Sequence, residues 1–322
     1  FIENADIDTN ILNIWAHSDN KIIGVAASGA GATDDGAIAG GVNLNFLTYN
    51  MYAYIGDGAT VNATDISVKA ENKNLLVSVA GVLAIGVNGA FAAGADVGLT
   101  FVESTVYAYV GSMAEVAGND LKVFASDDLE VVSVAAALAV SSNRLGGSGS
   151  AASVNLDQHV RAFVADRNWA AFLAVMDRNG DGRISEEEYL ANVADPGIAG
   201  GVFALADMNH DGYLSQAEYL ANQSALNAEA IGKIDLAGSL YIDADDKTNL
   251  IVIAGSVAGG SDAGIGIPVA NVNLPSRTVM AYIGRDAKVD AKGNGAGIAD
   301  PGGKLLNGQP FGGRGIRLDA AT

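Results

Sequence analysis

The sequence predicts a mainly β fold: a β-solenoid (β-helix) with a repeat of about 55 residues, which carries an inserted α-helical pair. Three observations predict it. Short segments of alternating apolar and polar residues recur at regular spacing, Gly and Ala fill the stretches between them, and two acidic loops interrupt the pattern. With 322 residues, the chain is long enough to bury a substantial core.

Two families of segments reveal the repeat. The first is LNIWA (12–16), ISVKA (66–70), LKVFA (121–125), LYIDA (240–244) and IRLDA (316–320), with first positions that differ by 54, 55, 119 and 76. The second is AYI (53–55), AYV (108–110), AFV (162–164) and AYI (281–283), with spacings of 55, 54 and 119. Each first-family segment closes on Ala, which predicts a half-buried strand leading into a turn.

Strand–turn–strand repeats without helices between them predict a solenoid, in which successive coils stack about 4.8 Å apart. A β-sandwich is the alternative, but the regular period favours the solenoid. The surplus spacing divides the chain into solenoid repeats (1–165), an insert (166–230) and a solenoid continuation (231–322) that contains a Gly-rich insertion, 291–315, expected to be a loop. We expect both insertions to leave the repeat at one corner. Both chain ends read as mid-repeat sequence, which predicts a portion of something longer or chains joined end to end.

Composition excludes several functions. The net charge of −19 disfavours binding to nucleic acid, and the absence of Cys removes thiol chemistry and disulfides. No apolar run reads as a transmembrane segment, because Gly, Asn, Ser and Asp interrupt each one.

The insert carries two copies of a calcium-loop pattern, DRNGDGRISEEEY (177–189) and DMNHDGYLSQAEY (207–219). Such a loop places oxygen ligands at positions 1, 3, 5, 7, 9 and 12, with Gly at position 6 for a sharp turn. The predicted ligands of the first loop are Asp177, Asn179, Asp181, the carbonyl of Arg183, Ser185 and Glu188. Those of the second are Asp207, Asn209, Asp211, the carbonyl of Tyr213, Ser215 and Glu218. Ile184 and Leu214, at position 8, are expected to join in a short two-stranded ribbon.

The flanks of the loops predict helices. Trp169, Phe172, Leu173 and Met176 recur with the spacing of one helical face, and Val202 and Phe203 occupy the equivalent places before the second loop. The exiting helices are expected to continue through YLANVA (189–194) and YLANQSALNAEA (219–230).

Residues 166–230 therefore resemble a paired EF-hand domain, which implies two bound Ca²⁺. The remainder, 1–165 and 231–322, resembles the β-helical repeats of very large secreted bacterial adhesins of the filamentous-haemagglutinin type. That resemblance rests on TVNATDISVKAENKNLLVSVAGVLAIG (60–86) and TVYAYVGS (105–112). It implies an extracellular or cell-surface structural protein without catalytic residues, which associates with itself end to end or laterally and contacts a protein or glycan.

Other polar residues receive structural interpretations. His17 and His159 are expected at the surface or in turns, and His210 points away from the ion at position 4 of its loop. The acids Asp127, Asp128, Asp243, Asp245 and Asp246 are expected in solvated turns, and GGSGSAAS (146–153) is expected to be a turn or a tightly packed segment.

The leading functional hypothesis is a non-enzymatic fibre or adhesin segment whose insert, with a net charge of −8 from eleven acids and three Arg, is ordered by calcium and makes contacts with subunits or partners. One alternative is a calcium-dependent β-helical enzyme acting on polysaccharides. Another is a docking module resembling dockerins, although Glu at position 12 and the mid-chain location disfavour it.

Overall fold

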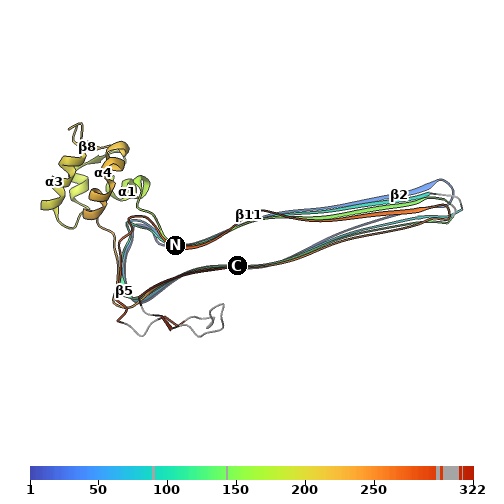
Figure 1. Ribbon diagram of the computed structural model, residues 1–322, viewed down its shortest axis with the longest axis horizontal. Coiled ribbons are helices and arrows are strands. Elements are labelled where there is room, and N and C mark those ends of the chain that lie inside the picture. The colour runs from blue at the N-terminus through green and yellow to red at the C-terminus, as the bar shows by residue number, and fades with distance from the viewer. Residues whose placement is uncertain (89–90, 143, 295–297, 300–311, 314) are drawn as a thin grey trace.

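The computed structural model describes residues 1–88, 91–142, 144–294, 298–299, 312–313 and 315–322. Two long parallel β-sheets form most of this part of the chain, and a group of helices lies at one end (Figure 1). This arrangement confirms the prediction of a mainly β chain with an inserted helical region.

The first sheet has the strand order β1–β3–β5–β10–β15. Its strands are Asp6–Ala32, Thr60–Gly86, Glu115–Ser141, Leu240–Gly259 and Ile316–Ala321, with the short strands β9 (Ile234–Leu236) and β12 (Val289–Ala291) beside the start of β5. The second sheet has the order β2–β4–β6–β11, with strands Gly36–Ile55, Phe91–Val110, Gly146–Val164 and Gly264–Ile283. All neighbouring strands within these two sheets are parallel.

The strand register joins the residues that the sequence repeat aligned. Backbone pairing places the first residues of the five first-family segments side by side, in the order Leu12, Ile66, Leu121, Leu240 and Ile316. The second family pairs in the same way through Ala53, Ala108, Ala162 and Ala281. Each residue therefore lies beside its counterpart one repeat later.

The strands are longer than the sequence predicted. A turn was expected after the Ala that closes each first-family segment, but β1, β3 and β5 run on past that Ala and end at Ala32, Gly86 and Ser141. The alternation of inward and outward side chains continues without a break through this part, so nothing stops the strand. The prediction of a turn there was wrong.

These extensions form the arm, which we define as residues 22–46, 76–101, 131–156 and 250–274. The arm projects away from the helices, and each repeat reverses direction at its far tip (Figure 1). Near the helices the interior combines Val, Ile and Leu with Ala, whereas towards the tip it is mostly Ala, with Val82 as the larger side chain. Backbone of the facing sheet approaches closely there: a Cβ added to Gly266 would lie 2.9 Å from the carbonyl oxygen of Ser256. Residues 146–153, expected to be a turn or a tightly packed segment, form the beginning of β6.

The acids expected in solvated turns lie within strands instead. The set Asp127, Asp128, Asp243, Asp245 and Asp246 belongs to β5 and β10. Asp127 and Asp246 point between the sheets and are fully buried, because the strand alternation continues through them. Asp127 accepts hydrogen bonds from Asn72 (3.0 Å) and Gln158 (3.1 Å), and Asp246 forms an ion pair of 2.7 Å with Arg277.

Aromatic rings form a row across the second sheet. The rings of Tyr54, Tyr109, Phe163 and Tyr282 stack nearly parallel, with centroids 4.7, 5.0 and 5.0 Å apart. They are the middle residues of the AYI-type segments, so the stack follows directly from the register.

The two insertions leave the repeat at different places. The helical insert joins β6 to β9 and occupies the position of the turns at 56–59 and 111–114, whereas the second insertion follows β12, on the far side of this short stretch of sheet. The expectation of a common corner was wrong, because a short strand separates the two points. Most of 291–315 lies outside the described residues; β13 (Ile298–Ala299) pairs antiparallel with β14 (Gly312–Gly313). Among the described residues, no helix is both long and apolar enough to span a membrane.

One buried acid makes the stability of the arm depend on pH. Asp96 of β4 is 1% exposed, and neither of its carboxylate oxygens has a hydrogen-bond partner of acceptable geometry. Burial raises the pKa of Asp96, and the nearby amides of Ala136 and Val97 offset this only in part. The protonated form is therefore favoured in the folded protein. The contribution of Asp96 to the free energy of unfolding is fully present below the pKa of the carboxyl in the unfolded chain, about 3.9. It is lost as the pH rises through the raised pKa of the folded protein.

We therefore expect Asp96→Asn to flatten the fall in unfolding free energy between pH 4 and pH 7, as measured by urea unfolding at both pH values. Asp262→Asn, at an exposed position in the turn at the tip of the arm, is the matched control and should leave the slope as in the parent chain. Equal slopes for all three proteins would show that Asp96 does not carry this dependence.

Candidate metal centre

The helical insert connects β6 to β9 through four helices and two short strands. They are α1 (Trp169–Met176), β7 (Ile184–Ser185), α2 (Glu186–Leu190), α3 (Pro196–Ala206), β8 (Tyr213–Leu214) and α4 (Gln216–Glu229). The entering helix and the second exiting helix lie where the sequence predicted them. The first exiting helix ends early, at Leu190 rather than near 194, because Val193 forms a bridge with Ala230.

Local sequence fixes each helix start. Asn168 caps α1 by accepting the amide of Ala171, and Asp195 caps α3, whose first residue is Pro196. Ser185 and Ser215 each form a capping box with the glutamate three residues later. The caps therefore set the orientation of Glu188 and Glu218, the last predicted ligands of the two loops.

A short antiparallel ribbon joins the loops, as predicted. Ile184 pairs with Leu214, and both side chains are buried in the core of the insert. That core contains Phe172, Met176, Tyr189, Phe203, Tyr219 and Leu226, together with Met113 from a turn between the sheets. The two loops are thus held side by side, and the insert packs against the end of the sheets.

The first loop is folded around Asp177. Its carboxylate accepts the amides of Gly180 (2.7 Å) and Gly182 (2.8 Å), while the side chain of Asn179 accepts the amide of Asp181 at 2.8 Å. Asp181 in turn accepts the amide of Arg183 at 2.8 Å. Gly182 has φ of 81°, a conformation that favours glycine and makes the sharp turn at position 6.

The second loop repeats these bonds. Asp207 accepts the amides of Asp211 (3.2 Å) and Gly212 (2.9 Å), and Asp211 accepts the amide of Tyr213 at 2.9 Å. His210 stands at position 4 with φ of 57°. Both loops have Asp, Asn, Asp and Gly at positions 1, 3, 5 and 6, so the shared hydrogen-bond pattern follows from the shared loop sequence.

Glu188 and Glu218 connect the end of each loop to its beginning. Glu188 accepts the amide of Ser185 at 2.9 Å through one oxygen and the amides of Arg178 (3.1 Å) and Asn179 (3.2 Å) through the other. The hydrogen bond from the Ser185 amide is the main reason why the pKa of Glu188 is lowered. Burial acts to raise the pKa of Glu218, but the hydrogen bonds from Ser215 and Asn209 outweigh it and lower the pKa. Both carboxylates are therefore charged at neutral pH.

The donors fit a hard divalent cation. Each loop offers three carboxylates, one side-chain amide, one hydroxyl and one backbone carbonyl, all of them oxygen ligands of the kind that Ca²⁺ takes. In the described part of the chain, no three Asp, Glu or His side chains already converge as a metal cluster. The carboxylates of Glu188 and Glu218 accept loop amides, and each carboxylate has further lone pairs that a cation can use.

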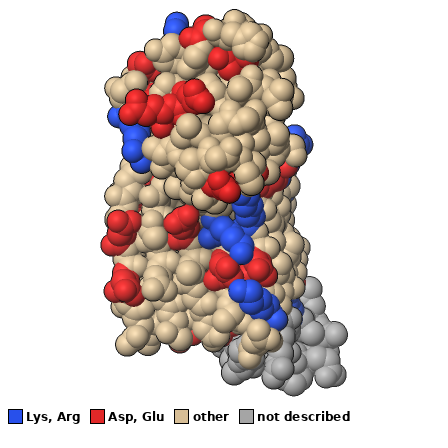
Figure 2. Space-filling model, turned by 90° about the vertical axis from the view of Figure 1, so that its left-hand side faces the viewer, with Lys and Arg blue, Asp and Glu red and all other residues tan. Residues whose placement is uncertain are grey.

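Figure 2 views the end of the molecule that carries the insert and shows acidic side chains gathered on its upper part, which the insert forms. Repulsion between these charges opposes packing of the helices, and a bound cation relieves it. The histidines are spread over three places: His17 contacts the ring of Trp15 at a tilt, His159 lies 3.3 Å from Asp157, and His210 is in the second loop.

A buried arginine attaches the insert to the sheets, and sequence reasoning missed it. Arg167 is 1% exposed and donates to the carbonyl oxygens of Ser112 (3.1 Å), Asn227 (3.0 Å) and Gly232. Lys288 donates to the carbonyl oxygens of Ala228 (2.6 Å) and Ala230 (2.9 Å). Both cations therefore satisfy carbonyls at the end of α4 from segments that connect the sheets. One sequence feature could have indicated this role: Arg167 is a positively charged residue at the start of the insert, and no acidic residue lies three or four positions away to pair with it.

Comparison with known proteins agrees with this geometry. Two segments, residues 170–193 and 199–221, match the family model of the EF hand, so the insert is a paired EF-hand, a calcium-binding module. No curated protein and no solved structure matches the chain.

Replacement of the buried arginine should release the insert. Arg167→Met leaves the carbonyls of Ser112, Asn227 and Gly232 without their donor, and bonds from charged donors contribute about 1.5–3 kcal/mol each. We expect the attachment of the insert to lose about 3 kcal/mol or more of stabilising free energy. Hydrogen exchange should detect this loss as faster exchange of the α4 amides. Arg144→Met, in an exposed turn at the tip of the arm, is the matched control. Unchanged exchange in Arg167→Met would remove the anchoring role.

Proposed function

We propose that this chain is a structural, non-enzymatic segment of an extracellular or cell-surface fibre or adhesin. In this proposal the parallel sheets are successive coils of a β-solenoid, and the EF-hand pair binds two Ca²⁺ and rigidifies a lateral projection. The proposed partners are further copies of the chain, end to end or side by side, and a protein or glycan at the surface.

The pairing across the insert is the observation that carries this proposal. Leu240 pairs with Leu121, and the parallel register then continues along the whole of β10, although the entire insert separates the paired strands in sequence. The sheet therefore passes the insert without losing register. A module accommodated in this way adds a projection to a rod while the rod itself stays continuous, as suits a structural protein.

Anchoring explains how calcium would matter to the rod. Arg167 and Lys288 attach α4 to segments between the strands, and Met113 from one of these turns packs in the core of the insert. Cations bound in the loops would order the helices and, through these contacts, fix the direction of the projection. Extracellular calcium is millimolar, which is sufficient for the weaker EF-hand sites.

The position of the buried acids supports the non-enzymatic assignment. Asp127 and Asp246 are the paired carboxylates most suggestive of acid–base chemistry. Both are enclosed between the sheets and engaged by Gln158, Asn72 and Arg277. A substrate outside the sheets cannot reach them, so their role is to stabilise the interior.

Removal of the last ligand of each loop tests the calcium sites. Glu188→Gln and Glu218→Gln each replace a bidentate carboxylate with an amide, so titration calorimetry should show two Ca²⁺ per parent chain and one tight Ca²⁺ per variant. The affected loop should bind about 100-fold more weakly or worse. Glu187→Gln, at an exposed neighbouring position, should bind as the parent does. Two unaltered sites in either variant would contradict the ligand assignment.

Electron microscopy of the chain in calcium and after chelation tests the structural role. We expect elongated particles in both states, with the lateral projection well defined only in calcium. Elongated particles that break into short pieces on chelation would instead place the EF-hand pair in the contacts between subunits. Compact particles in both states would contradict the fibre proposal.

A further inference from the structure

The outer surface of the arm is unusual for a protein in water. Its interior near the tip is made of small residues, and its large apolar side chains point outward. We define the arm face as the outward side chains of residues 36–46, 91–101, 146–156 and 264–274, from β2, β4, β6 and β11. Its exposed apolar members are Ile38, Val42, Leu44, Phe46, Phe91, Phe101, Ile265, Ile267 and Val269. A contiguous apolar surface of this kind marks an interaction site.

The same four segments are free of outward charge. Their sequences contain one ionisable residue, Asp96, and its side chain is buried between the sheets. The chain as a whole carries −19, so two copies repel each other over most of their surfaces. The arm face is a place where a second copy can approach without bringing like charges together.

The dimensions of the arm face suit a protein interface. Eleven residues at about 3.3 Å each give a length of about 36 Å, and four strands about 4.8 Å apart give a width of about 19 Å. The product, about 700 Å², is close to the roughly 800 Å² that each partner buries in a standard interface. Val and Ile on a pleated surface also pack well against a second pleated sheet.

The relief of the arm face is self-complementary. The outward side chains of β2 form a ridge, in which Ile38 and Phe46 are each 70% exposed. The outward residues of β6 are small (Gly147, Gly149, Ala151 and Ser153), and a Cβ added to Gly147 would have no atom within 4 Å. The ridge of one copy therefore matches the low strip over β6 of another, as a two-fold related pair requires.

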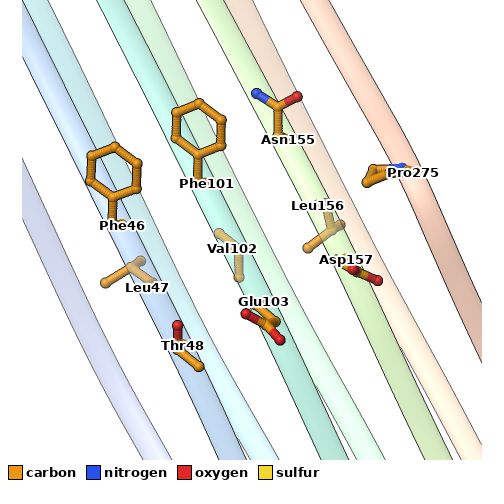
Figure 3. Close-up of a pocket in the computed structure, with 10 residues that line it drawn as sticks. All are labelled: Phe46, Leu47, Thr48, Phe101, Val102, Glu103, Asn155, Leu156, Asp157 and Pro275. Carbon is orange, nitrogen blue, oxygen red and sulfur yellow. The ribbon is translucent and has the colours of Figure 1, made fainter.

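Figure 3 shows the border of this surface on the side of the helices. Phe46 and Phe101 stack with ring centroids 4.9 Å apart. Asn155 continues their row on β6, with a smaller side chain in place of a ring. A shallow groove of about 260 Å³ crosses the strands beside this row, and Glu103 and Asp157 line its other side. The apolar surface ends where these carboxylates begin.

We propose that two copies of this chain pack arm face against arm face around a two-fold axis, with the β2 ridge of each over the β6 strip of the other. This rests on the proposed side-by-side association of copies and specifies its surface, and it is independent of calcium binding, because the arm face lies far from the EF-hand insert (Figure 1). A lipid bilayer is the competing occupant. Of the four charged residues in the turns at the tip, Asp34, Asp35 and Asp262 are acidic and only Arg144 is basic, which disfavours approach to anionic headgroups.

The absence of Cys from the parent chain allows a specific crosslinking test. Val42→Cys on the ridge and Ala151→Cys on the strip each introduce a single thiol. Mixing the two variants with a short bis-maleimide, which adds one thiol at each end, should give a crosslink between positions 42 and 151. Val257→Cys, on the opposite surface of the arm and as exposed as Val42 (63% against 62%), is the matched control and should not crosslink to Ala151→Cys. Equal yields from both mixtures would overturn the assignment of the face.

Sedimentation of the full chain measures the pairing itself. Val42→Lys places like charges in the contact and should weaken dimerisation at least about tenfold, whereas Val257→Lys and chelation of calcium should leave it unchanged. Circular dichroism checks that each variant is folded. A parent chain that stays monomeric at all concentrations overturns the proposal, and flotation of that monomer with phosphatidylcholine vesicles would identify the bilayer as the occupant. Loss of dimer on chelation alone would assign the contact to the insert instead.

Discussion

Parallel backbone pairing between residues one repeat apart is the constraint on which the rest of the structure depends. It fixes Leu12, Ile66, Leu121, Leu240 and Ile316 in one row, and every other position of the repeat follows. Since inward and outward side chains alternate, a slip of a single residue would exchange interior and surface along a whole strand. The chain must therefore specify register strongly, and much of its repetition serves that end.

Rows of like residues have different consequences for different chemistry. Aromatic rings in such a row stack favourably on their neighbours. The stack of Tyr54, Tyr109, Phe163 and Tyr282 is an example. Carboxylates repel each other, and here Asp246 lies next to Asp127 in the row. The chain offsets this repulsion with Gln158, which donates to both acids. Such a polar group between the sheets also penalises any slip that would leave it unpaired.

The sequence predicted the register and the calcium loops because both depend on spacing alone. The spacings between the first-family segments recur as the sequence offsets between paired strands. The ligand residues of each calcium loop lie within one short continuous segment. The length of the strands was not predicted, because a run of polar residues such as the one after Ala125 is compatible with a turn as well as with a continuing strand. The outward apolar surface and the contacts of Arg167 were missed too, since both depend on how the sheets face each other, which a repeat spacing does not contain.

The position of the insert follows from the same pairing. Val164 and Ile234 end and begin strands that a short turn joins in the other repeats, so their separation is set by the sheets and not by the length of chain between them. Closing a longer loop costs only slightly more entropy than closing a short one. A whole domain is therefore tolerated at this turn, provided that its two ends stay close together. Arg167 meets that condition by joining Ser112, Asn227 and Gly232 at one point, so the attachment of the domain and the continuity of the sheets depend on the same few hydrogen bonds.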